Sequence, residues 1–309
     1  MKALVFGGTG FIGRRLVENL LRENWDVTIA TSGKSQNPFG DTVSTVVVNR
    51  YEETSIEEKL SSPPYFDIVF DQIGFCPNDM KLMVDFFHKR IGSYVFVSSA
   101  AVYADKRGTV RESDFDPMAL HIRNEPASAL GYNEGKRNAE AYLFQNATFP
   151  VSAARFPNVI GYDDSTTRFQ KEVFRIRDRK RFNIRKRGVL RNYVWVEDAG
   201  RFLFWLGTNR KSGSYNAASP DSISAESLLS EIGKSLGIEP QISIDPGMDS
   251  STPYYRDEEL VLSTKKAESE GFNFTPTNEW LDSEVKKVIE NNGQTGNSTE
   301  HMKWIFGKR

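Results

Sequence analysis

The sequence predicts an α/β protein built on a doubly wound parallel sheet, and three observations carry that prediction. Short apolar runs, typical of buried strands, alternate with segments whose apolar residues recur at helical spacing. The chain opens on one such run, and a glycine-rich turn follows it directly. Its 309 residues are enough for one large or two modest domains with a sizeable core.

Three glycines, Gly7, Gly10 and Gly13, follow an apolar run at 3–6, and apolar residues then recur at helical spacing, at Ile12, Leu16, Leu20 and Leu21. Gly7 permits the tight turn, Gly10 lets the backbone approach a pyrophosphate, and Gly13 lets helix and strand pack closely. The helix N-terminus then offers unpaired N–H groups and a favourable dipole to an anion. This order of strand, turn and helix predicts a Rossmann dinucleotide site, against the alternative of a glycine turn without a ligand.

Further elements follow in alternation. Strands are predicted at 26–30, 43–48, 67–70, 93–97, 194–198 and 241–244, and helices at 52–60, 77–89, 132–145, 199–206, 224–236 and 280–289. Strands that alternate with helices indicate a parallel sheet, whose ligands bind beyond the carboxyl ends of the strands. The chain closes with a polar segment at 291–298 and an apolar end at Trp304, Ile305 and Phe306, which could dock on the body of the protein or lie in an intermolecular contact.

Composition excludes several classes of function. The formal net charge is -1, so nothing in the overall charge favours nucleic acid or an anionic membrane. The single cysteine, Cys76, excludes an internal disulfide and fits a reducing compartment. The three histidines are scattered without ligand spacing, so we expect no metal site. No apolar run is long enough to span a bilayer, and no signal peptide is recognisable, so we expect a cytoplasmic protein.

The end of the second predicted strand bears on the choice of cofactor. An acid near this point often binds the adenosine ribose of NAD. Here residues 30–34 contain none, and a 2′-phosphate would meet Thr31, Ser32 and Lys34, with Arg14 and Arg15 within reach from the helix. The cofactor is therefore NAD or NADP, and this strand end favours NADP unless Lys34 is simply a solvated loop lysine.

Hydroxyl groups gather where the nicotinamide of such a cofactor would lie. The fifth predicted strand ends in Ser98 and Ser99, and Tyr132 and Lys136 follow on one face of a later helix. An ammonium near a phenol stabilises the phenolate and lowers its pKa towards neutrality, which suits proton transfer. A serine hydroxyl can hold the substrate oxygen against that phenol. The Y-x-x-x-K spacing is weak alone and gains its meaning from the glycine motif and the Ser-Ser strand end.

Together these motifs resemble the extended short-chain dehydrogenase/reductase family, the NAD-dependent epimerase/dehydratase group. The matching stretches occur in the family's order over nearly the whole chain. They are residues 7–13 (GGTGFIG), 98–103 (SSAAVY), 132–136 (YNEGK), 155–161 (RFPNVIG), 191–198 (RNYVWVED) and, more weakly, 263–267 (STKKA) with Gly271 and Phe272.

The resemblance implies a role for each matching residue. Tyr132 would be the catalytic acid/base, Lys136 would bind the nicotinamide ribose and tune Tyr132, and Ser99 would orient the substrate. Cofactor contacts would come from the backbone N–H groups of Phe11 and Ile12, and from Pro157 and Val159 beside the nicotinamide. Substrate contacts would come from Asn158, beside the sugar, and from Arg191, which matches an arginine that contacts the diphosphate in sugar-nucleotide members. The resemblance also implies a homodimer through the helices after Asn78 and at Tyr132.

Three departures from the family pattern limit the expectation. Asn49 stands where the family often has an adenine-binding Asp. Ala100 and Ala101 follow Ser99, whereas sugar-nucleotide 4,6-dehydratases carry an Asp-Glu pair there, which argues against that chemistry. An acidic loop at 111–117 lengthens the segment between Ser99 and Tyr132, either as a substrate-side flap or as a plain surface loop.

Residues 168–191 hold eleven Lys or Arg residues against only Glu172 and Asp178. One interpretation is a solvated amphipathic helix with Phe169, Val173 and Ile176 facing inward. A second is a phosphate-binding rim for a nucleotide-linked sugar. A third is RNA binding, because some chloroplast relatives of the family associate with RNA, although no RNA-reading motif accompanies the stretch.

We therefore expect a Rossmann domain over residues 1–160, with a return segment at about 191–215, and a smaller C-terminal substrate-binding lobe at 161–190 and 216–309. The favoured function is an NAD(P)-dependent epimerase or reductase acting on a hydroxyl-bearing carbon, with a nucleotide sugar as substrate. The alternative is a non-catalytic scaffold or RNA-binding relative, because fold alone does not fix function.

Overall fold

The computed structural model describes residues 1–62, 65–123, 125 and 127–291. Its largest element is a seven-stranded sheet in the order β12-β7-β5-β4-β1-β2-β3, in which every pair is parallel. Its strands, in chain order, are β1 (Lys2–Phe6), β2 (Asp26–Thr31), β3 (Ser44–Val47), β4 (Phe66–Asp71), β5 (Ile91–Ser99), β7 (Val151–Phe156) and β12 (Gly213–Asn216). This confirms the doubly wound parallel sheet expected from the alternating pattern.

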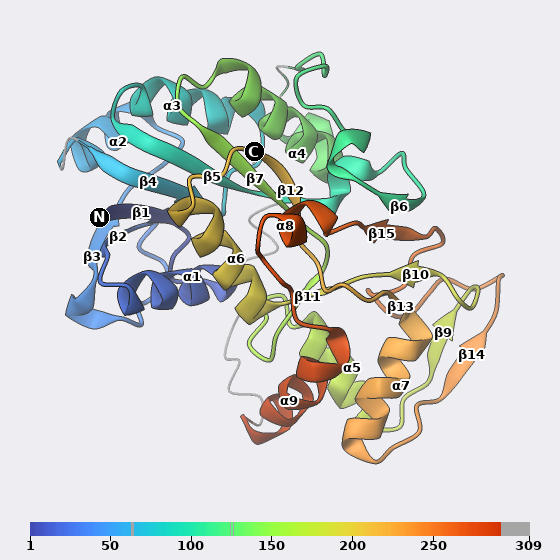
Figure 1. Cartoon of the computed structure of the whole chain (residues 1–309). Coiled ribbons are helices and arrows are strands. Elements are labelled where there is room, and N and C mark those ends of the chain that lie inside the picture. The colour runs from blue at the N-terminus through green and yellow to red at the C-terminus, as the bar shows by residue number, and fades with distance from the viewer. Residues whose placement is uncertain (63–64, 124, 126, 292–309) are drawn as a thin grey trace.

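Helices cover both faces of this sheet (Figure 1). They are α1 (Phe11–Arg22) and α6 (Val196–Thr208) on one face, and α2 (Glu53–Leu60), α3 (Pro77–Phe87) and α4 (Ala127–Asn146) on the other. The alternation of β1 decides the faces, because Ala3 and Val5 pack with α1 and α6 while Leu4 and Phe6 pack with α2 to α4. Burial on both faces explains why β1 is an unbroken apolar run.

Most of the remaining elements form a smaller, lower part in Figure 1, with its own apolar core around Trp280, Phe169 and Tyr254. Its helices are α5 (Arg168–Arg177), α7 (Ala225–Leu236) and α9 (Thr277–Glu290). Helix α8 (Lys265–Ser269) instead packs against β12, and its Ala267 belongs to the core on the α1 and α6 side of the large sheet. The short strands form a sheet β13-β10-β15-β6, whose β6 end lies at the upper right of Figure 1, and two pairs, β11 with β8 and β14 with β9. They are β6 (Gly108–Val110), β8 (Val159–Ile160), β9 (Phe182–Ile184), β10 (Leu190–Arg191), β11 (Val194–Trp195), β13 (Ile223–Ser224), β14 (Ile242–Ile244) and β15 (Leu260–Leu262).

One expectation from the sequence is wrong, and another concerns residues outside the described part of the chain. The prediction of a strand over 194–198 is wrong beyond Trp195, because α6 begins at Val196 and takes Glu197 and Asp198 into its first turn, where the helix dipole favours acids. The predicted tail segments at 291–298 and 304–306 extend beyond Asn291 and so lie outside the described residues. No helix among the described residues has the length and apolarity needed to cross a membrane.

The order of the strands also locates the site. The chain runs from β1 to β2 and β3 on one side, then returns to β4, β5, β7 and β12 on the other. The reversal lies between β1 and β4, and in doubly wound sheets ligands bind at the carboxyl ends of the strands at such a switch point. The glycine turn after β1 and the turn after β4 both lie there.

Candidate active site and nucleotide cleft

The turn after β1 has the geometry of an anion cradle. Gly7 has a φ of +83°, which L side chains rarely adopt, and a Cβ at Gly13 would lie 2.1 Å from the Gly7 carbonyl oxygen. A Cβ at Gly10 would meet nothing closer than 3.5 Å, so this glycine is not required by internal packing. Gly10 precedes α1, whose first turn holds no acid and receives no side-chain cap from the N-cap residue. The N–H groups of Phe11 and Ile12 at this helix end therefore fit a pyrophosphate.

The residues expected at the adenosine end of the cofactor form a less distinctive arrangement than the glycine turn. Ser32 follows β2 and is exposed, and Thr31 Oγ1 accepts the Gly33 N–H at 3.2 Å. Asn49 follows β3, is exposed, and uses its side-chain oxygen to accept the Tyr51 N–H at 3.2 Å. These polar groups can meet a ribose or an adenine, and they do not distinguish NAD from NADP.

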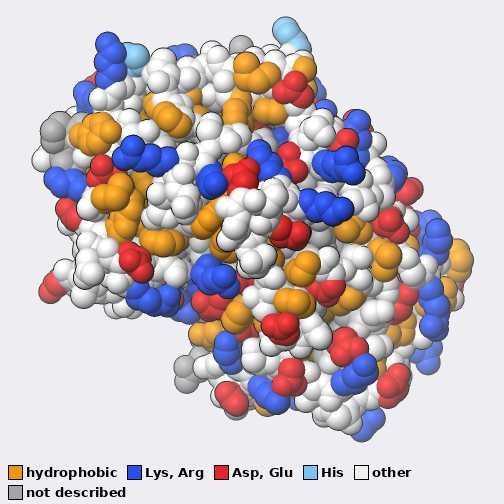
Figure 2. All heavy atoms as spheres, viewed as in Figure 1, with side chains coloured by type: hydrophobic (Ala, Val, Ile, Leu, Met, Phe, Trp, Pro, Cys, Tyr) orange, Lys and Arg blue, Asp and Glu red, His pale blue; other side chains and the backbone are white. Residues whose placement is uncertain are grey.

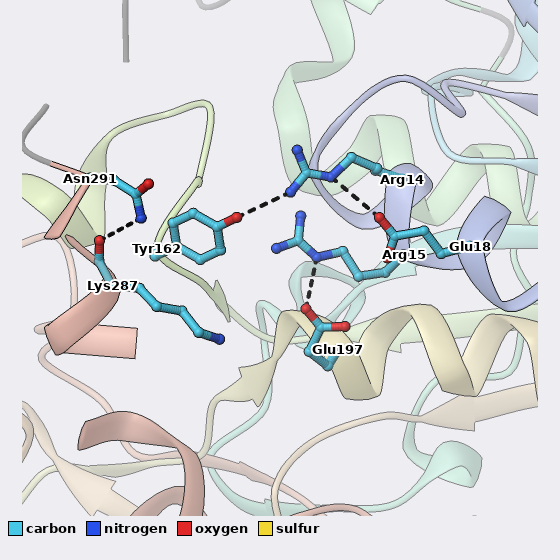
Figure 3. Close-up of a pocket in the computed structure, with 7 residues that line it drawn as sticks. All are labelled: Arg14, Arg15, Glu18, Tyr162, Glu197, Lys287 and Asn291. Carbon is cyan, nitrogen blue, oxygen red and sulfur yellow. Dashed lines mark hydrogen bonds and ion pairs between the residues drawn. The ribbon is translucent and has the colours of Figure 1, made fainter. Parts of the chain in front are cut away.

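Arg14 and Arg15, expected within reach of a 2′-phosphate, are instead engaged by acids. Both guanidinium groups pair with Asp163, at 2.6 Å and 2.5 Å, and Arg15 also pairs with Glu197 at 3.0 Å. Figure 3 shows both pointing towards Tyr162. Their positive charge is thus neutralised at the junction of α1, α6 and the loop after β8, and the preference for NADP loses their support.

A cavity of about 340 Å³ lies at this junction. Its lining is Arg14, Arg15, Glu18, Tyr162, Glu197, Lys287 and Asn291 (Figure 3). Every cation of the lining has a carboxylate partner, including Lys287, which pairs with Glu284 at 2.7 Å. Ser99, Tyr132 and Lys136 are not among the lining residues, so this cavity is distinct from the predicted site.

Tyr132 begins the regular part of α4. Gly131, with a φ of +67°, breaks the helix directly before it. The Tyr132 side chain is 42% exposed, and its ring lies 5.8 Å from the ring of Phe75 in the turn after β4. A phenol that is half open to solvent and held by an aromatic neighbour is accessible to a substrate.

Lys136, one helical turn later, is buried. Its Nζ donates to the carbonyl oxygens of Gly74 and Val97, both at 2.8 Å, and lies 4.8 Å from the centre of the Phe96 ring. Burial lowers the pKa of Lys136 to about 8, despite the opposing effect of Asp71 and other carboxylates. A lysine with this pKa remains mostly protonated at neutral pH and carries its charge in a poorly solvated place.

Ser99 ends β5, two residues beyond the Val97 carbonyl that binds Lys136. Its Oγ accepts the Ala101 N–H at 3.2 Å, while Ser98 points inward and donates to Glu140 Oε2 at 2.6 Å. The structure therefore brings Ser99 and Lys136 to the same strand end. Across the described part of the chain, no hydrogen bond joins the side chains of Ser99, Tyr132 and Lys136 to one another.

The segment after β7 borders the same end of the sheet. Ser99 lies opposite Phe156 in the register of β5 and β7, and Pro157, Asn158 and Val159 follow, all half-buried. The Asn158 carbonyl accepts the Val194 N–H at 3.2 Å, and β8 pairs with β11 directly beyond it. Backbone pairing thus fixes these three residues beside the Ser99 strand end.

A buried ion pair lies behind the serines. Arg155 and Glu140 are both fully buried and pair with each other. Arg155 also donates to the carbonyl oxygens of Glu112 at 2.8 Å and Phe115 at 3.0 Å. The acidic loop at 111–117 is therefore anchored through its backbone, which argues for a fixed segment rather than a moving flap.

In the smaller part, Arg191 has a neighbour that sequence reasoning missed. The pKa of Arg191 is lowered by burial and then by the positive charge of Arg256. Arg191 donates to the Glu258 carbonyl at 3.2 Å, and Arg256 to the Pro253 and Tyr255 carbonyls at 2.9 Å and 2.7 Å. Among the ion pairs of the described residues, neither arginine has a carboxylate partner. Two neighbouring cations without a counter-ion form a site suited to an anion. Only the fold brings them together, because 65 positions separate them (256 − 191).

For part of residues 168–191, the structure agrees with the first of the three interpretations, an amphipathic helix. Phe169, Val173 and Ile176 are buried on the inner face of α5, as expected for an amphipathic helix.

Within the described residues, no group of three or more His, Cys, Asp or Glu side chains could hold a metal ion.

A parallel sheet with an open, glycine-lined helix N-terminus at its switch point defines a Rossmann-type protein. The sequence matches the model of the NAD dependent epimerase/dehydratase family over residues 3–218. The chain belongs to that family, and the resemblance seen in its motifs is confirmed.

Solved structures of the same fold lie close to this one. The dTDP-glucose 4,6-dehydratase of Bacillus anthracis str. Ames, solved with NAD, superposes with a TM-score of 0.74 at 16% identity, covering 96% of this chain and 98% of that one. The UDP-glucose 4-epimerase of Thermus thermophilus, also solved with NAD, gives 0.70 at 19% identity, covering 94% and 99%. At these identities the likeness shows the shared fold.

A curated relative is similar over a shorter stretch. It is the chloroplast stem-loop binding protein of 41 kDa b of Arabidopsis thaliana, 28% identical over 149 residues. The match covers 43% of this chain and 39% of that protein, so it spans about two-fifths of the relative's length.

Proposed function

We propose that this protein is an NAD(P)-dependent epimerase or reductase that acts on a hydroxyl-bearing carbon of a nucleotide sugar. The observation that carries the proposal is the buried ammonium of Lys136, bonded to the end of β5 and one helical turn from an accessible tyrosine. Family membership and neighbours whose names specify sugar-nucleotide substrates support the same class of reaction.

The cofactor would lie across the carboxyl ends of β1, β4 and β5. Gly7, Gly10 and Gly13, with the N–H groups of Phe11 and Ile12, would hold its pyrophosphate. Ser32 and Asn49 would meet the adenosine end, and Lys136, Pro157 and Val159 the nicotinamide end. When bound, the nicotinamide supplies a site that accepts or donates a hydride.

The protein's own residues would move the proton. Tyr132 would take the proton of the substrate hydroxyl, and the Lys136 ammonium would stabilise the phenolate form. Ser99 would orient the substrate oxygen towards Tyr132, because its Oγ lies at the strand end that Lys136 also contacts. In an epimerase, the hydride would then return to the opposite face of a keto intermediate and Tyr132 would give its proton back. In a reductase, Tyr132 would instead give its proton to the oxygen of a carbonyl whose carbon receives the hydride, and the cofactor would leave oxidised.

The diphosphate of the substrate would bind between Arg191 and Arg256, with Asn158 nearer the sugar. Among the described residues, these two cations lack carboxylate partners, so a diphosphate would neutralise them, which favours its binding. The planar guanidinium group of arginine also matches the geometry of phosphate oxygens.

A homodimer through α3 and α4 belongs to the same proposal, and sedimentation velocity of the purified chain tests it.

Tyr132→Phe is the direct test of the catalytic assignment. We expect NADH or NADPH to bind this variant as it binds the parent, while turnover of a panel of UDP- and dTDP-sugars falls by about 10³-fold or more. Epimer formation is followed by chromatography and cofactor oxidation at 340 nm. Unchanged turnover in Tyr132→Phe would exclude Tyr132 as the acid/base.

The exposed basic residues on α5 and in the segment from α5 to β10 favour a second candidate, nucleic-acid binding. They are Lys171, Arg177, Arg179, Lys180, Arg181, Arg185, Lys186 and Arg187. Figure 2 shows Lys and Arg side chains along the right-hand edge, where Figure 1 draws β9 and β14. RNA stem-loop binding that weakens steeply with salt, and weakens further in a Lys180→Ala/Arg181→Ala variant, would support this function. Absence of binding at low salt would exclude it.

A further inference from the structure

The turn between β4 and α3 contacts the helix face that carries Tyr132 and Lys136 at two points. The Gly74 carbonyl accepts a hydrogen bond from Lys136 Nζ at 2.8 Å. The Phe75 ring packs against Tyr132, and a Cβ at Gly135 would lie 2.7 Å from that ring, so only glycine admits this contact. The position of this turn therefore decides where both side chains of the predicted catalytic pair lie.

Asp71, the last residue of β4, fixes one half of the turn. Its Oδ1 accepts the N–H groups of Ile73 at 3.0 Å and Gly74 at 2.9 Å. Arg50 binds the same carboxylate through two nitrogens, at 2.6 Å and 2.8 Å, and the Tyr94 hydroxyl donates to it at 2.6 Å. Asp71 is fully buried, and no other carboxylate contacts Arg50 among the ion pairs of the described residues.

Asp79, on the first turn of α3, fixes the other half. Its Oδ2 accepts the N–H groups of Phe75 at 2.9 Å and Cys76 at 3.3 Å. Two carboxylates thus hold four consecutive backbone N–H groups, and the Gly74 carbonyl between them is held facing Lys136. Such a turn has little freedom to move independently of Asp71.

The charges around Lys136 come from several elements. Burial lowers the pKa of Lys136, Asp71 opposes this most strongly, Asp79 and Glu140 oppose it as well, and Arg50 lowers it further. Burial would also raise the pKa of Asp71, but Arg50 and the donated hydrogen bonds hold it at about 2. Asp71 is therefore charged at every pH at which the protein would work, and it acts on Lys136 through its charge rather than through a hydrogen bond.

We propose that Asp71 is a positioning residue, which fixes the Lys136 ammonium on the Tyr132 face of α4 through the Gly74 carbonyl and balances its charge. The inference deepens the proposed function, on which its catalytic meaning rests. Arg50, from the segment after β3, and Tyr94, from β5, hold Asp71 in place. Because Asp71 is fully buried, it would act on the chemistry through Lys136 and not by contact with cofactor or substrate.

Asp71→Asn separates the charge from the geometry, because an amide oxygen still accepts the Ile73 and Gly74 N–H groups. The readout is the titration of Lys136 in cofactor-free protein labelled with ¹³C-lysine, with the Lys136 resonance assigned by its loss in Lys136→Arg. We expect the titration midpoint to fall by about one pH unit or more in Asp71→Asn. The matched control is Tyr94→Phe, which removes a hydrogen bond from Asp71 but no charge, and should shift the midpoint by less than about 0.3 unit.

Asp71→Asn leaves Arg50 buried and unpaired, which can prevent folding. Asp71→Asn combined with Arg50→Met replaces the ion pair with neutral side chains and keeps the proposal testable. Because Asp71 affects the pKa of Lys136 more than Arg50 does, the double variant should also lower the midpoint, by less than the single one. A midpoint that does not move in either folded variant would overturn the inference. The titration needs no turnover, so failure of the parent to bind NADH and NADPH would remove the proposed function without affecting this result.

Discussion

The arginines of the two parts of the molecule have different partners. In the large sheet, Arg50 and Arg155 are fully or almost fully buried, and each pairs with a carboxylate that is itself completely buried, Asp71 or Glu140. In the smaller part, the half-buried Arg191 and the exposed Arg256 lie near each other and bond only to carbonyl oxygens among the described residues. Neutralised cations hold the frame in place, whereas cations without a counter-ion are available to a ligand.

Breaking a neutralised pair should have the largest effect on stability. Glu140→Ala leaves the Arg155 guanidinium buried and unpaired, and should lower the free energy of unfolding by about 3–5 kcal/mol. Urea denaturation followed by circular dichroism measures the change. Adding Arg155→Met to the same chain should recover much of the loss, because no buried charge then remains. A single variant as stable as the parent would show that the pair does not hold the frame.

Lys136 sharpens the comparison, because it is buried yet hydrogen-bonded to carbonyl oxygens. Its pKa of about 8 in the folded protein lies below the 10.5 that is usual for a solvated lysine. Between these two pH values the unfolded chain binds the proton that the folded protein has released, so stability should rise with pH, by up to about 3 kcal/mol. Urea midpoints at pH 7.5 and pH 10 measure the rise, and Lys136→Met should lack it. Equal rises in parent and variant would mean that Lys136 keeps its proton throughout.

Arg191 and Arg256 have no carboxylate partner among the described residues, so their removal should weaken ligand binding rather than stability. Arg256→Ala and Arg191→Ala should each weaken the binding of UDP by roughly 10–100-fold, since each removes a charge-assisted contact to phosphate. Neither should lower stability as Glu140→Ala does, because each relieves repulsion between like charges. Isothermal titration with UDP gives the affinities, and Arg201→Ala, on the exposed side of α6, is a matched control. Unchanged UDP affinity in both variants would separate this pair from the substrate site.

A smaller change in stability is expected at low pH. The Asp71 carboxyl has a pKa of about 2, below the 3.8 that is usual for a solvated aspartate, so its contribution to stability is present above about pH 4 and is lost as the pH falls towards 2. We expect about 2 kcal/mol from this group, seen as a shallower acid transition in Asp71→Asn with Arg50→Met. An acid transition identical to that of the parent would indicate that Asp71 is not held by Arg50 in solution.

The sequence predicted helices and strands better than it predicted which side chains interact across the fold. The sequence predicted β1 to β5 of the large sheet from their short apolar runs but missed β7 and β12. It predicted the glycine turn because the glycine spacing has a mechanism. The helix at Val196 was misassigned because residues 194–196 carry a strand-like apolar pattern into a helix start. Arg256, Asp71 and Glu140 could not be recognised, because their importance depends on partners far along the chain. Only the tertiary fold brings such residues together.

In the proposed function, the glycine turn after β1 and the α4 face that carries Lys136 bind one and the same dinucleotide. The most direct measurement is to denature the purified protein, identify any released ligand by mass and absorbance, and titrate the emptied site with NADH and NADPH. We expect NAD or NADP in the released fraction, or saturable binding of at least one of the two reduced forms. Retained NAD would favour an epimerase, and tighter binding of NADPH would support a reductase with Ser32 and Lys34 at the 2′-phosphate. A protein that releases neither nucleotide and binds neither would contradict the claim.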